Sequence, residues 1–192
     1  MNFLSHLHLS GNDEELMLGN FMADSVKGKE LFNYSEEVQK GIVLHRKIDA
    51  FTDSHAVVEK SKARLRSNYR KYAPVIVDIF YDHFLAVNWE NYHNSSLPEY
   101  ADEVYSLMKQ HEGALPQRTA MFVQYMIKYD VLNAYAKIEG VEQVLKGMDG
   151  RAKFNSNMAL SVRELRQHYH HFEDEFNTYY PLLESYVAGE VG

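Results

Sequence analysis

The stretch PVIVDIFYDHFLAVNW, residues 74–89, decides the fold class of this 192-residue chain. Its apolar residues recur at intervals of three and four, which is the period of an α-helix with one buried face. Pro74 fits the first helical turn, where its missing N–H would have no intrahelical partner. The same spacing runs through most of the chain, which has only four prolines and ten glycines. The sequence therefore predicts an all-α helical bundle, and its length and 45% hydrophobic content predict a single domain over residues 1–192.

Caps and breakers give approximate bounds for the expected helices. Asn12 followed by Glu15 resembles a capping arrangement, and Ser35 can cap a helix whose first turn is acidic. The opening residues MNFLSHLHL alternate in polarity and predict an extended segment with His6 and His8 on one side. The expected helices cover about 13–25, 35–51, a stretch that begins at Asp53 or Ser54, 74–89, 99–111, 117–138, 141–147 and 156–180, with the last ended or bent at Pro181.

Composition excludes several classes of function. The chain has no cysteine, so it has no disulfide framework, no thiolate metal ligand and no cysteine nucleophile. The opening MNFLSHLHLSGNDEEL lacks the features of a signal peptide, and no apolar run approaches the roughly 20 residues of a membrane span, which predicts a cytoplasmic protein without a membrane partner. The net charge of −7 argues against nucleic-acid binding.

Ionisable residues lie on the apolar stripes of two expected helices. In the helix over 35–51, His45 and Asp49 continue the stripe of buried residues that precedes them. In the helix over 74–89, Asp78 and Asp82 share an apolar stripe, and His83 lies on the adjoining one. These groups are therefore expected to point inward and to need a compensating partner.

A divalent metal ion would provide that compensation. An unpaired buried carboxylate costs several kcal/mol, and two carboxylates one turn apart repel each other unless a cation or a proton lies between them. Imidazole and carboxylate ligands without thiolate favour Mn²⁺, Fe²⁺ or Mg²⁺, and Zn²⁺ is also compatible. Asp24, which ends an apolar helix, is a further candidate ligand. The alternative is an internal salt-bridge network, for example Asp78 with Arg70.

The remaining histidines and the searches for known catalytic motifs give less information about function. His6 and His8 can ligate a metal, support the ligands from a second shell, or lie at the edge of the core. His168, His170 and His171 lie on a polar helix and are expected to face solvent. The chain has no glycine-rich phosphate loop, no G-x-S-x-G elbow and no H-E-x-x-H motif.

Several segments together resemble one family through nearly the whole chain. They are MNFLSHLHL at 1–9, the stretch that ends in Asp24, HRKID at 45–49 with Thr52 and Asp53, DIFYDHF at 78–84, and VLKGM at 144–148. In this order they resemble acyl carrier protein phosphodiesterases, which are regarded as divergent HD-type phosphohydrolases. Here the adjacent pair reads Asp82-His83, where the HD pattern has His-Asp, and Arg46 follows His45.

The resemblance implies an HD-like helical fold and an enzyme that uses divalent metal, commonly manganese. The implied reaction is hydrolysis of the phosphodiester between 4′-phosphopantetheine and the serine of holo-acyl carrier protein. Arg46 could hold a non-bridging phosphoryl oxygen, or form a surface ion pair instead. The expected metal ligands are Asp24, His45, Asp78, Asp82 and His83; the expected catalytic residues are Arg46, Asp49 and Asp82, with His6 and His8 in the second shell.

A basic run lies at residues 60–71 and contains no acidic residue. It is either a solvated helix face or a docking surface for the acidic helices of a carrier protein. Its cationic residues are Lys60, Lys62, Arg64, Arg66, Arg70 and Lys71. Two other functions remain open at this point: a metal phosphohydrolase that acts on a small nucleotide or other phosphoester, and a non-catalytic helical scaffold.

Overall fold

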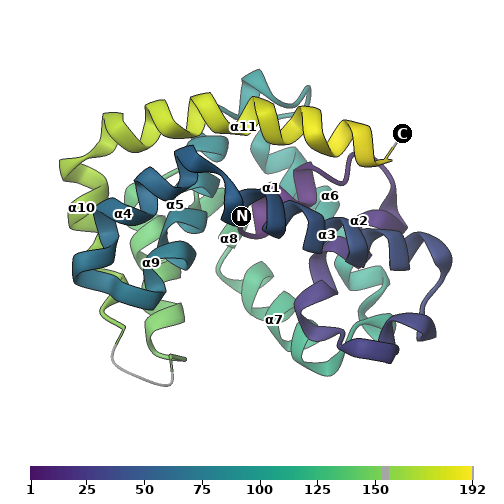
Figure 1. The fold of residues 1–192 in the computed structure, drawn as a ribbon. Coiled ribbons are helices and arrows are strands. Elements are labelled where there is room, and N and C mark those ends of the chain that lie inside the picture. Colours follow the sequence, from purple (N-terminus) through teal and green to yellow (C-terminus); the bar gives the residue numbers. More distant parts are fainter. Residues whose placement is uncertain (153–155, 192) are drawn as a thin grey trace.

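The computed structural model describes residues 1–152 and 156–191, which form eleven α-helices, six short 3-10 helices and no β-strand (Figure 1). The all-α prediction is therefore confirmed. The α-helices are α1 (Phe3–His8), α2 (Glu14–Met22), α3 (Glu36–Ser54), α4 (Ala56–Tyr69), α5 (Ala73–Val87), α6 (Leu97–Gln110), α7 (Gln117–Lys128), α8 (Val131–Ala134), α9 (Ile138–Asp149), α10 (Val162–Gln167) and α11 (Tyr169–Val191). Two of the 3-10 helices, η1 (Ala23–Ser25) and η2 (Gly28–Asn33), connect α2 to α3.

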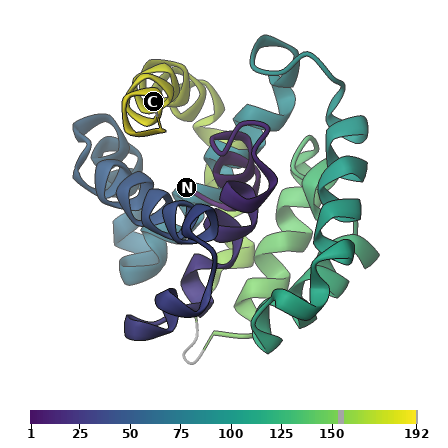
Figure 2. The same cartoon turned by 90° about the vertical axis from the view of Figure 1, so that its right-hand side faces the viewer.

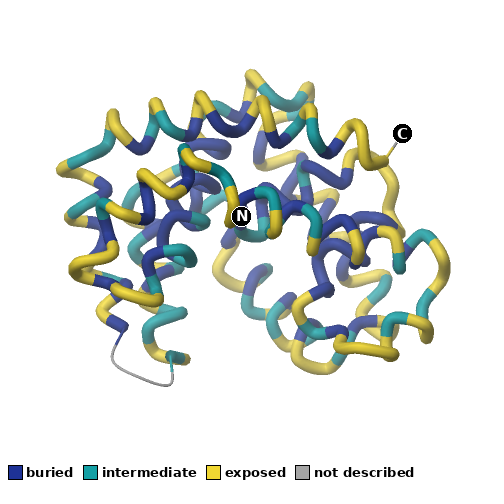
Figure 3. The backbone as a smooth tube through the Cα atoms, in the orientation of Figure 1, coloured by how far each residue is buried: buried dark blue, intermediate teal, exposed yellow. Residues whose placement is uncertain are grey.

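The long helix α11 lies across one side of the molecule and packs on α3, α4 and α5 (Figure 1). Figure 2 shows α11 nearly end-on, with the N-terminus in the middle of the molecule. The helix α5 contacts α1, α4, α9 and α11, so it is the central element of the core. Buried residues gather on the inward faces of all these helices, and exposed residues lie on the outside (Figure 3). Among the residues that the structure describes, no helix is both long and apolar enough to cross a lipid bilayer.

The N-terminal segment is helical, so the prediction of an extended segment is wrong. Asn2 caps α1 because its side-chain oxygen accepts a hydrogen bond from the Phe3 N–H at 2.8 Å. Alternating polarity over six residues does not separate a strand from a helix this short. Residues two apart on an α-helix point to different sides. His6 and His8 therefore diverge.

Other helix bounds also differ from the prediction. The helix expected over 117–138 is divided at Asp130, whose φ of 47° is left-handed and interrupts the helical ladder. The helix α3 continues through Ser54, and α4 begins only after His55, whose side chain caps it. Pro181 lies inside α11 and does not end it. Proline removes one backbone donor, and the long packed helix tolerates that loss.

The helices α2 and α3 touch through their backbones. A Cβ atom on Gly19 would lie 2.1 Å from the Val38 carbonyl oxygen, and one on Gly41 would lie 2.2 Å from the Leu16 carbonyl oxygen. Only glycine fits at such a contact. This close approach brings the end of α2 against the middle of α3, where the candidate site is located.

Candidate metal centre

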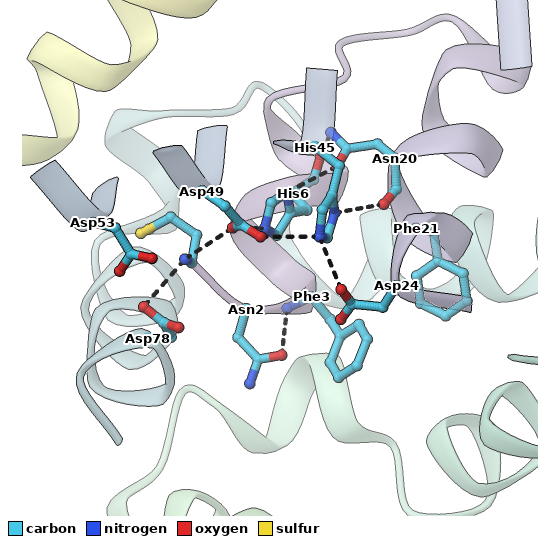
Figure 4. Close-up of a pocket in the computed structure, with 11 residues that line it drawn as sticks. Asn2, Phe3, His6, Asn20, Phe21, Asp24, His45, Asp49, Asp53 and Asp78 are labelled. Atoms are coloured by element: carbon cyan, nitrogen blue, oxygen red, sulfur yellow. Dashed lines mark hydrogen bonds and ion pairs between the residues drawn. The ribbon is translucent and has the colours of Figure 1, made fainter. Parts of the chain in front are cut away.

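A pocket of about 170 Å³ lies where α1, α2, α3 and α5 meet. Each of these helices supplies polar side chains that face the same space (Figure 4). The lining residues are Met1, Asn2, Phe3, His6, Asn20, Phe21, Asp24, His45, Asp49, Asp53 and Asp78. Of the ligands expected from sequence, Asp24, His45 and Asp78 line this pocket, together with Asp49 and His6.

Three of these side chains form the centre of the site. Nε2 of His6 lies 3.2 Å from one Asp49 oxygen, and Nε2 of His45 lies 3.2 Å from the other. The two imidazole rings stack at 4.0 Å between centroids. Although the carboxylate is near, neither Nε2 atom has a hydrogen-bond partner within the described part of the chain, and both are buried. One ligand atom from each residue lies within 4.8 Å of the others, so His6, His45 and Asp49 form a triad that could hold a metal ion.

Asn20 fixes the orientation of both imidazole rings. Its side-chain oxygen lies 2.8 Å from Nδ1 of His6, and its backbone oxygen lies 2.8 Å from Nδ1 of His45. Because both oxygens only accept, each Nδ1 carries the proton, and in the neutral ring the Nε2 lone pair faces the pocket. Sequence reasoning missed Asn20. The available signal was a short amide inside the apolar run LMLGNFM, where a fully buried polar side chain requires partners.

Further carboxylates surround the triad. The Asp24 side chain is largely exposed, and one of its oxygens lies 3.5 Å from Nε2 of His45. Asp78 lies 3.1 Å from the buried amino group of Met1, which is also 3.8 Å from Asp49. In Figure 4 these carboxylates approach the centre from two sides. The pocket therefore concentrates negative charge, and cationic groups of the chain balance part of it.

The titration behaviour of the site follows from burial and from these contacts. Burial lowers the pKa of His6 to about 4, so this ring is neutral at pH 7. Burial also acts to lower the pKa of His45, but the carboxylates of Asp24 and Asp49 outweigh it and raise this pKa to about 9. Burial acts to raise the pKa of Asp49, but the two imidazoles and the Met1 amino group outweigh it and lower this pKa. Burial raises the pKa of Asp78. The site thus holds one protonated and one neutral imidazole around an ionised carboxylate.

Asp82 does not line the pocket. It is fully buried beneath α1 and accepts hydrogen bonds from the Leu4 N–H at 2.8 Å, the Ser5 N–H at 3.2 Å and the Ser5 hydroxyl at 2.5 Å. These are the N–H groups at the start of a helix that have no intrahelical partner. Burial raises the pKa of Asp82 to about 7 despite these donors. Asp82 therefore anchors the helix that carries His6.

His83 and His8 also lie outside the pocket. His83 has its Nδ1 2.7 Å from the Tyr135 carbonyl oxygen and its Nε2 3.2 Å from the Tyr169 hydroxyl. His8 contacts the Tyr180 hydroxyl at 2.8 Å with Nδ1 and a backbone carbonyl at 3.1 Å with Nε2. All four ring nitrogens therefore have partners in the core, and burial lowers the pKa of both histidines.

Arg46 is exposed on α3 and does not line the pocket. Its guanidinium donates to the Val26 carbonyl oxygen at 3.3 Å, so it contacts the segment that follows Asp24. The side chain lies close enough to the η1 turn to stabilise it.

Much of the basic run is compensated within the molecule. Arg64 forms two hydrogen bonds with Glu175 of α11, at 2.8 and 2.9 Å, and so ties α4 to α11. Lys71 lies over the ring of its neighbour Tyr72. Two other cations are in ion pairs, Lys62 with Asp53 at 2.7 Å and Arg66 with Glu59 at 2.6 Å. Lys60 and Arg70 are exposed.

The chain is an all-helical protein in which two buried imidazoles and a carboxylate form a cluster that could hold a metal ion. Comparison with known sequences identifies the family of the chain. The family model for acyl carrier protein phosphodiesterase matches residues 1–183. The chain therefore belongs to the acyl carrier protein phosphodiesterase family.

Curated relatives agree with this assignment. The chain is 34% identical over 184 residues to an acyl carrier protein phosphodiesterase of Yersinia pestis, with 95% of each chain covered. It is 35% identical over 184 residues to that of Photorhabdus laumondii, which covers 95% of this chain and 93% of the relative. It is also 35% identical over 187 residues to that of Klebsiella pneumoniae, with 95% of each chain covered. No solved structure shows a significant match to the chain.

Proposed function

We propose that this protein hydrolyses the phosphodiester between 4′-phosphopantetheine and the serine of holo-acyl carrier protein, and that a divalent metal ion bound by His6, His45 and Asp49 supports the reaction. Membership of a family of acyl carrier protein phosphodiesterases supports the reaction. The observation that carries the metal is the pair of buried Nε2 atoms that face the two oxygens of one carboxylate, with one ligand atom of each residue within 4.8 Å of the others. A metal ion would take the place of the His45 proton and accept the lone pairs of both rings.

The donor set is compatible with Mn²⁺, which is our proposal for the native ion, and Fe²⁺, Mg²⁺ and Zn²⁺ are the alternatives to compare. Nitrogen and oxygen donors without sulfur suit this group of ions. Such an ion supplies a bound water of lowered pKa and polarises a phosphoryl oxygen. Asp24 and Asp78 lie beside the triad and would complete the ligand set.

The chain's own residues take the remaining roles in this proposal. Asp49 contacts both imidazoles and keeps its charge, so it orders the centre. Arg46 lies near η1 and would bind a non-bridging phosphoryl oxygen. Asp82 acts through α1, because the N–H groups that it accepts from fix the helix bearing His6. His83 takes no part, because both its nitrogens have partners elsewhere.

The basic run is proposed as the docking surface for the acidic carrier protein, through its exposed members. Lys60 and Arg70 are the cations to test, because both are exposed, whereas Lys62, Arg64 and Arg66 are held in ion pairs. Lys60→Glu with Arg70→Glu should raise KM for the carrier protein at low salt, and the effect should fade as salt screens exposed charges. Lys109→Glu with Lys137→Glu, two exposed reversals outside the run, is the matched control. If the test variant and the control have the same KM for the carrier protein, the basic run is not its docking surface.

The decisive experiment is mass spectrometry of holo-acyl carrier protein incubated with this protein and Mn²⁺. We expect release of the phosphopantetheine arm, arrest by excess chelator, and loss of activity in His45→Ala. His170→Ala, which removes an exposed imidazole, should behave as wild type. Hydrolysis of nucleotides with no action on the carrier protein would favour a small-phosphoester hydrolase. A protein that retains no metal and hydrolyses neither substrate would be a scaffold.

A cytoplasmic location and a single cooperative domain complete the proposal. Cell fractionation tests the location. A single unfolding transition seen by several probes tests the domain organisation. Separate transitions would indicate more than one unit.

A further inference from the structure

One wall of the pocket is aromatic. Phe3 and Phe21 line it with ring centroids 5.6 Å apart, close to Asp24, whereas Asp53 and Asp78 lie across the pocket (Figure 4). The phosphate of a substrate held at the triad would have Asp53 and Asp78 on one side and the two phenyl rings, with Asp24 at their edge, on the other. An uncharged group attached to that phosphate fits the aromatic side better, because carboxylates favour cations and water.

The aromatic wall continues as a row of rings along α7. Phe122 stacks on Phe3 at 4.4 Å between centroids, Tyr125 lies 6.2 Å from Phe122, and Tyr129 lies 4.6 Å from Tyr125. Residues 122, 125 and 129 are three and four apart, so they share one face of the helix. Phe122 and Tyr125 are half-buried, and Tyr129 is 51% exposed. The row therefore runs from the pocket toward the surface.

The adjoining face of α7 serves the core, since Val123 and Met126 are buried there. The aromatic residues widen the apolar surface of this helix: Phe122 and Tyr125 pack against the edge of the core and stay partly exposed, and Tyr129 extends the row outward. Partly exposed aromatic rings in a continuous row are typical of a surface that binds a ligand.

Two contacts hold this row in place relative to the pocket. The Thr119 hydroxyl donates to the Ser25 hydroxyl at 2.8 Å, and Ser25 is adjacent to Asp24. A Cβ atom on Gly147 of α9 would lie 2.7 Å from the Tyr125 hydroxyl, so a glycine at this position leaves room for the ring. The VLKGM segment, one of those that resemble the family, contains this glycine.

A guanidinium group covers the middle of the row. Arg151 lies 5.8 Å from the Phe122 centroid and 5.5 Å from the Tyr125 centroid, within the range of a cation–π contact. The side chain is exposed and has donors available for a carbonyl oxygen. The row therefore combines apolar faces with hydrogen-bond donors.

We propose that the row Phe3, Phe122, Tyr125 and Tyr129, with Arg151, binds the pantetheine arm of the substrate. The inference rests on the proposed function, because it takes the arm's phosphate to lie at the triad. The arm is a narrow, uncharged chain with two methyl groups next to the phosphate and two amides beyond them. The methyl groups suit Phe3 and Phe21, and the amides suit the faces and donors further along the row. An acidic protein surface would instead require several cations.

Binding is tested first without catalysis. In saturation-transfer NMR, pantetheine that lacks the phosphate is added to the metal-free protein, so neither the metal nor hydrolysis is needed. Transfer to the methyl and methylene protons of pantetheine is expected for wild type, and it should weaken in Tyr125→Ala and in Gly147→Ala, where the new methyl group displaces the Tyr125 hydroxyl. Gln124→Ala, an exposed change on the same helix that points away from the row, should retain the transfer. No transfer to wild type, or equal transfer to all variants, would overturn the proposal.

Kinetics then locate the arm. Carrier protein with the full arm is compared with the same protein whose arm ends after the pantoate unit. Tyr125→Ala and Tyr129→Ala should each lower kcat/KM for the full arm about threefold to tenfold and leave the truncated arm unaffected. Equal losses on both substrates would refute the row as a binding site while the proposed function stands. If wild type hydrolyses neither substrate with Mn²⁺, the proposed function fails, and the NMR result still decides whether the row binds pantetheine.

Discussion

Replacing Asn20 by alanine is the sharpest test of how the metal centre is held. The Asn20 amide oxygen lies 2.8 Å from His6 Nδ1 and 3.2 Å from His45 Nδ1, and its amide nitrogen donates to the His6 carbonyl and the Ser10 hydroxyl, each at 2.9 Å. In Asn20→Ala, His45 keeps its bond to the Asn20 backbone oxygen at 2.8 Å, but Nδ1 of His6 loses its partner. The variant should therefore disturb His6 more than His45.

The expected magnitudes follow from these contacts. A buried donor left unpaired costs about 1–3 kcal/mol, and the two lost hydrogen bonds of the amide nitrogen cost about 1 kcal/mol each, so the free energy of unfolding should fall by roughly 3–5 kcal/mol. Metal affinity should fall about 10-fold to 100-fold, as is usual when the group that orients an imidazole ligand is removed. The ligands themselves remain, so binding weakens without being abolished.

Urea denaturation and calorimetric titration with Mn²⁺ measure the two effects. Ser10→Ala is the matched control, because it removes a buried partner of Asn20 and leaves both contacts to the imidazole rings. It should lower stability and keep metal affinity. If Asn20→Ala binds Mn²⁺ as tightly as wild type does, Asn20 does not orient the ligands.

Three further predictions address titration and packing. The raised pKa of His45, about 9, keeps this ring protonated at pH 7, whereas His6 is already neutral, so Mn²⁺ binding should release about one proton. The apparent Mn²⁺ affinity should therefore fall about tenfold per pH unit from pH 8 to pH 5. Calorimetry in buffers of different ionisation enthalpy counts the released proton, and no release would exclude His45 as a ligand. Burial raises the pKa of Asp82 to about 7, above its unfolded value of about 3.9, so the contribution of Asp82 to stability is lost as pH rises from about 4 to 7. The difference in urea midpoint between wild type and Asp82→Asn should therefore decrease over this pH range. A difference that does not change with pH contradicts the prediction. Arg64→Glu places a carboxylate against Glu175 and should lower the unfolding free energy by about 1–3 kcal/mol in urea denaturation, and unchanged stability would mean that the pair contributes little.

The inward-facing charges were the most informative part of the sequence. His45, Asp49 and Asp78 interrupt apolar stripes, and the structure places all three around one pocket. Helical periodicity is a local property, so spacing alone predicts which face a residue occupies. It does so well when the helix is long and packed on one side, as α3 and α5 are.

Periodicity could not predict what each inward charge contacts. Asp78 and Asp82 are one turn apart on α5, yet Asp78 meets the pocket and Asp82 meets the backbone N–H groups of α1. The partner of Asp82 lies 78 positions away in the sequence, and no local pattern marks a backbone N–H as free. The inward orientation of Asp82 was therefore predictable, whereas its partner was not.

His6 was missed as a central residue for a related reason. The polarity pattern at the start of the chain is compatible with a strand and with a short helix. Only in the helix do the side chains of His6 and His8 point to different sides. That helix depends on contacts with Asn2 and with Asp82, the second of which is distant in sequence. The role of His6 thus depends on a tertiary contact that fixes secondary structure.

The proposed metal centre depends on residues that are not themselves proposed ligands. His6 is held by α1, and α1 is anchored by Asp82 of α5. His45 is oriented by Asn20, which reaches it only because the glycine contact brings α2 against α3. The two imidazoles therefore reach Asp49 through two supports, the anchoring of α1 by Asp82 and the contacts of Asn20, which orients both rings. Because metal binding needs both rings together, weakening either support should lower affinity even where the other ring stays in place.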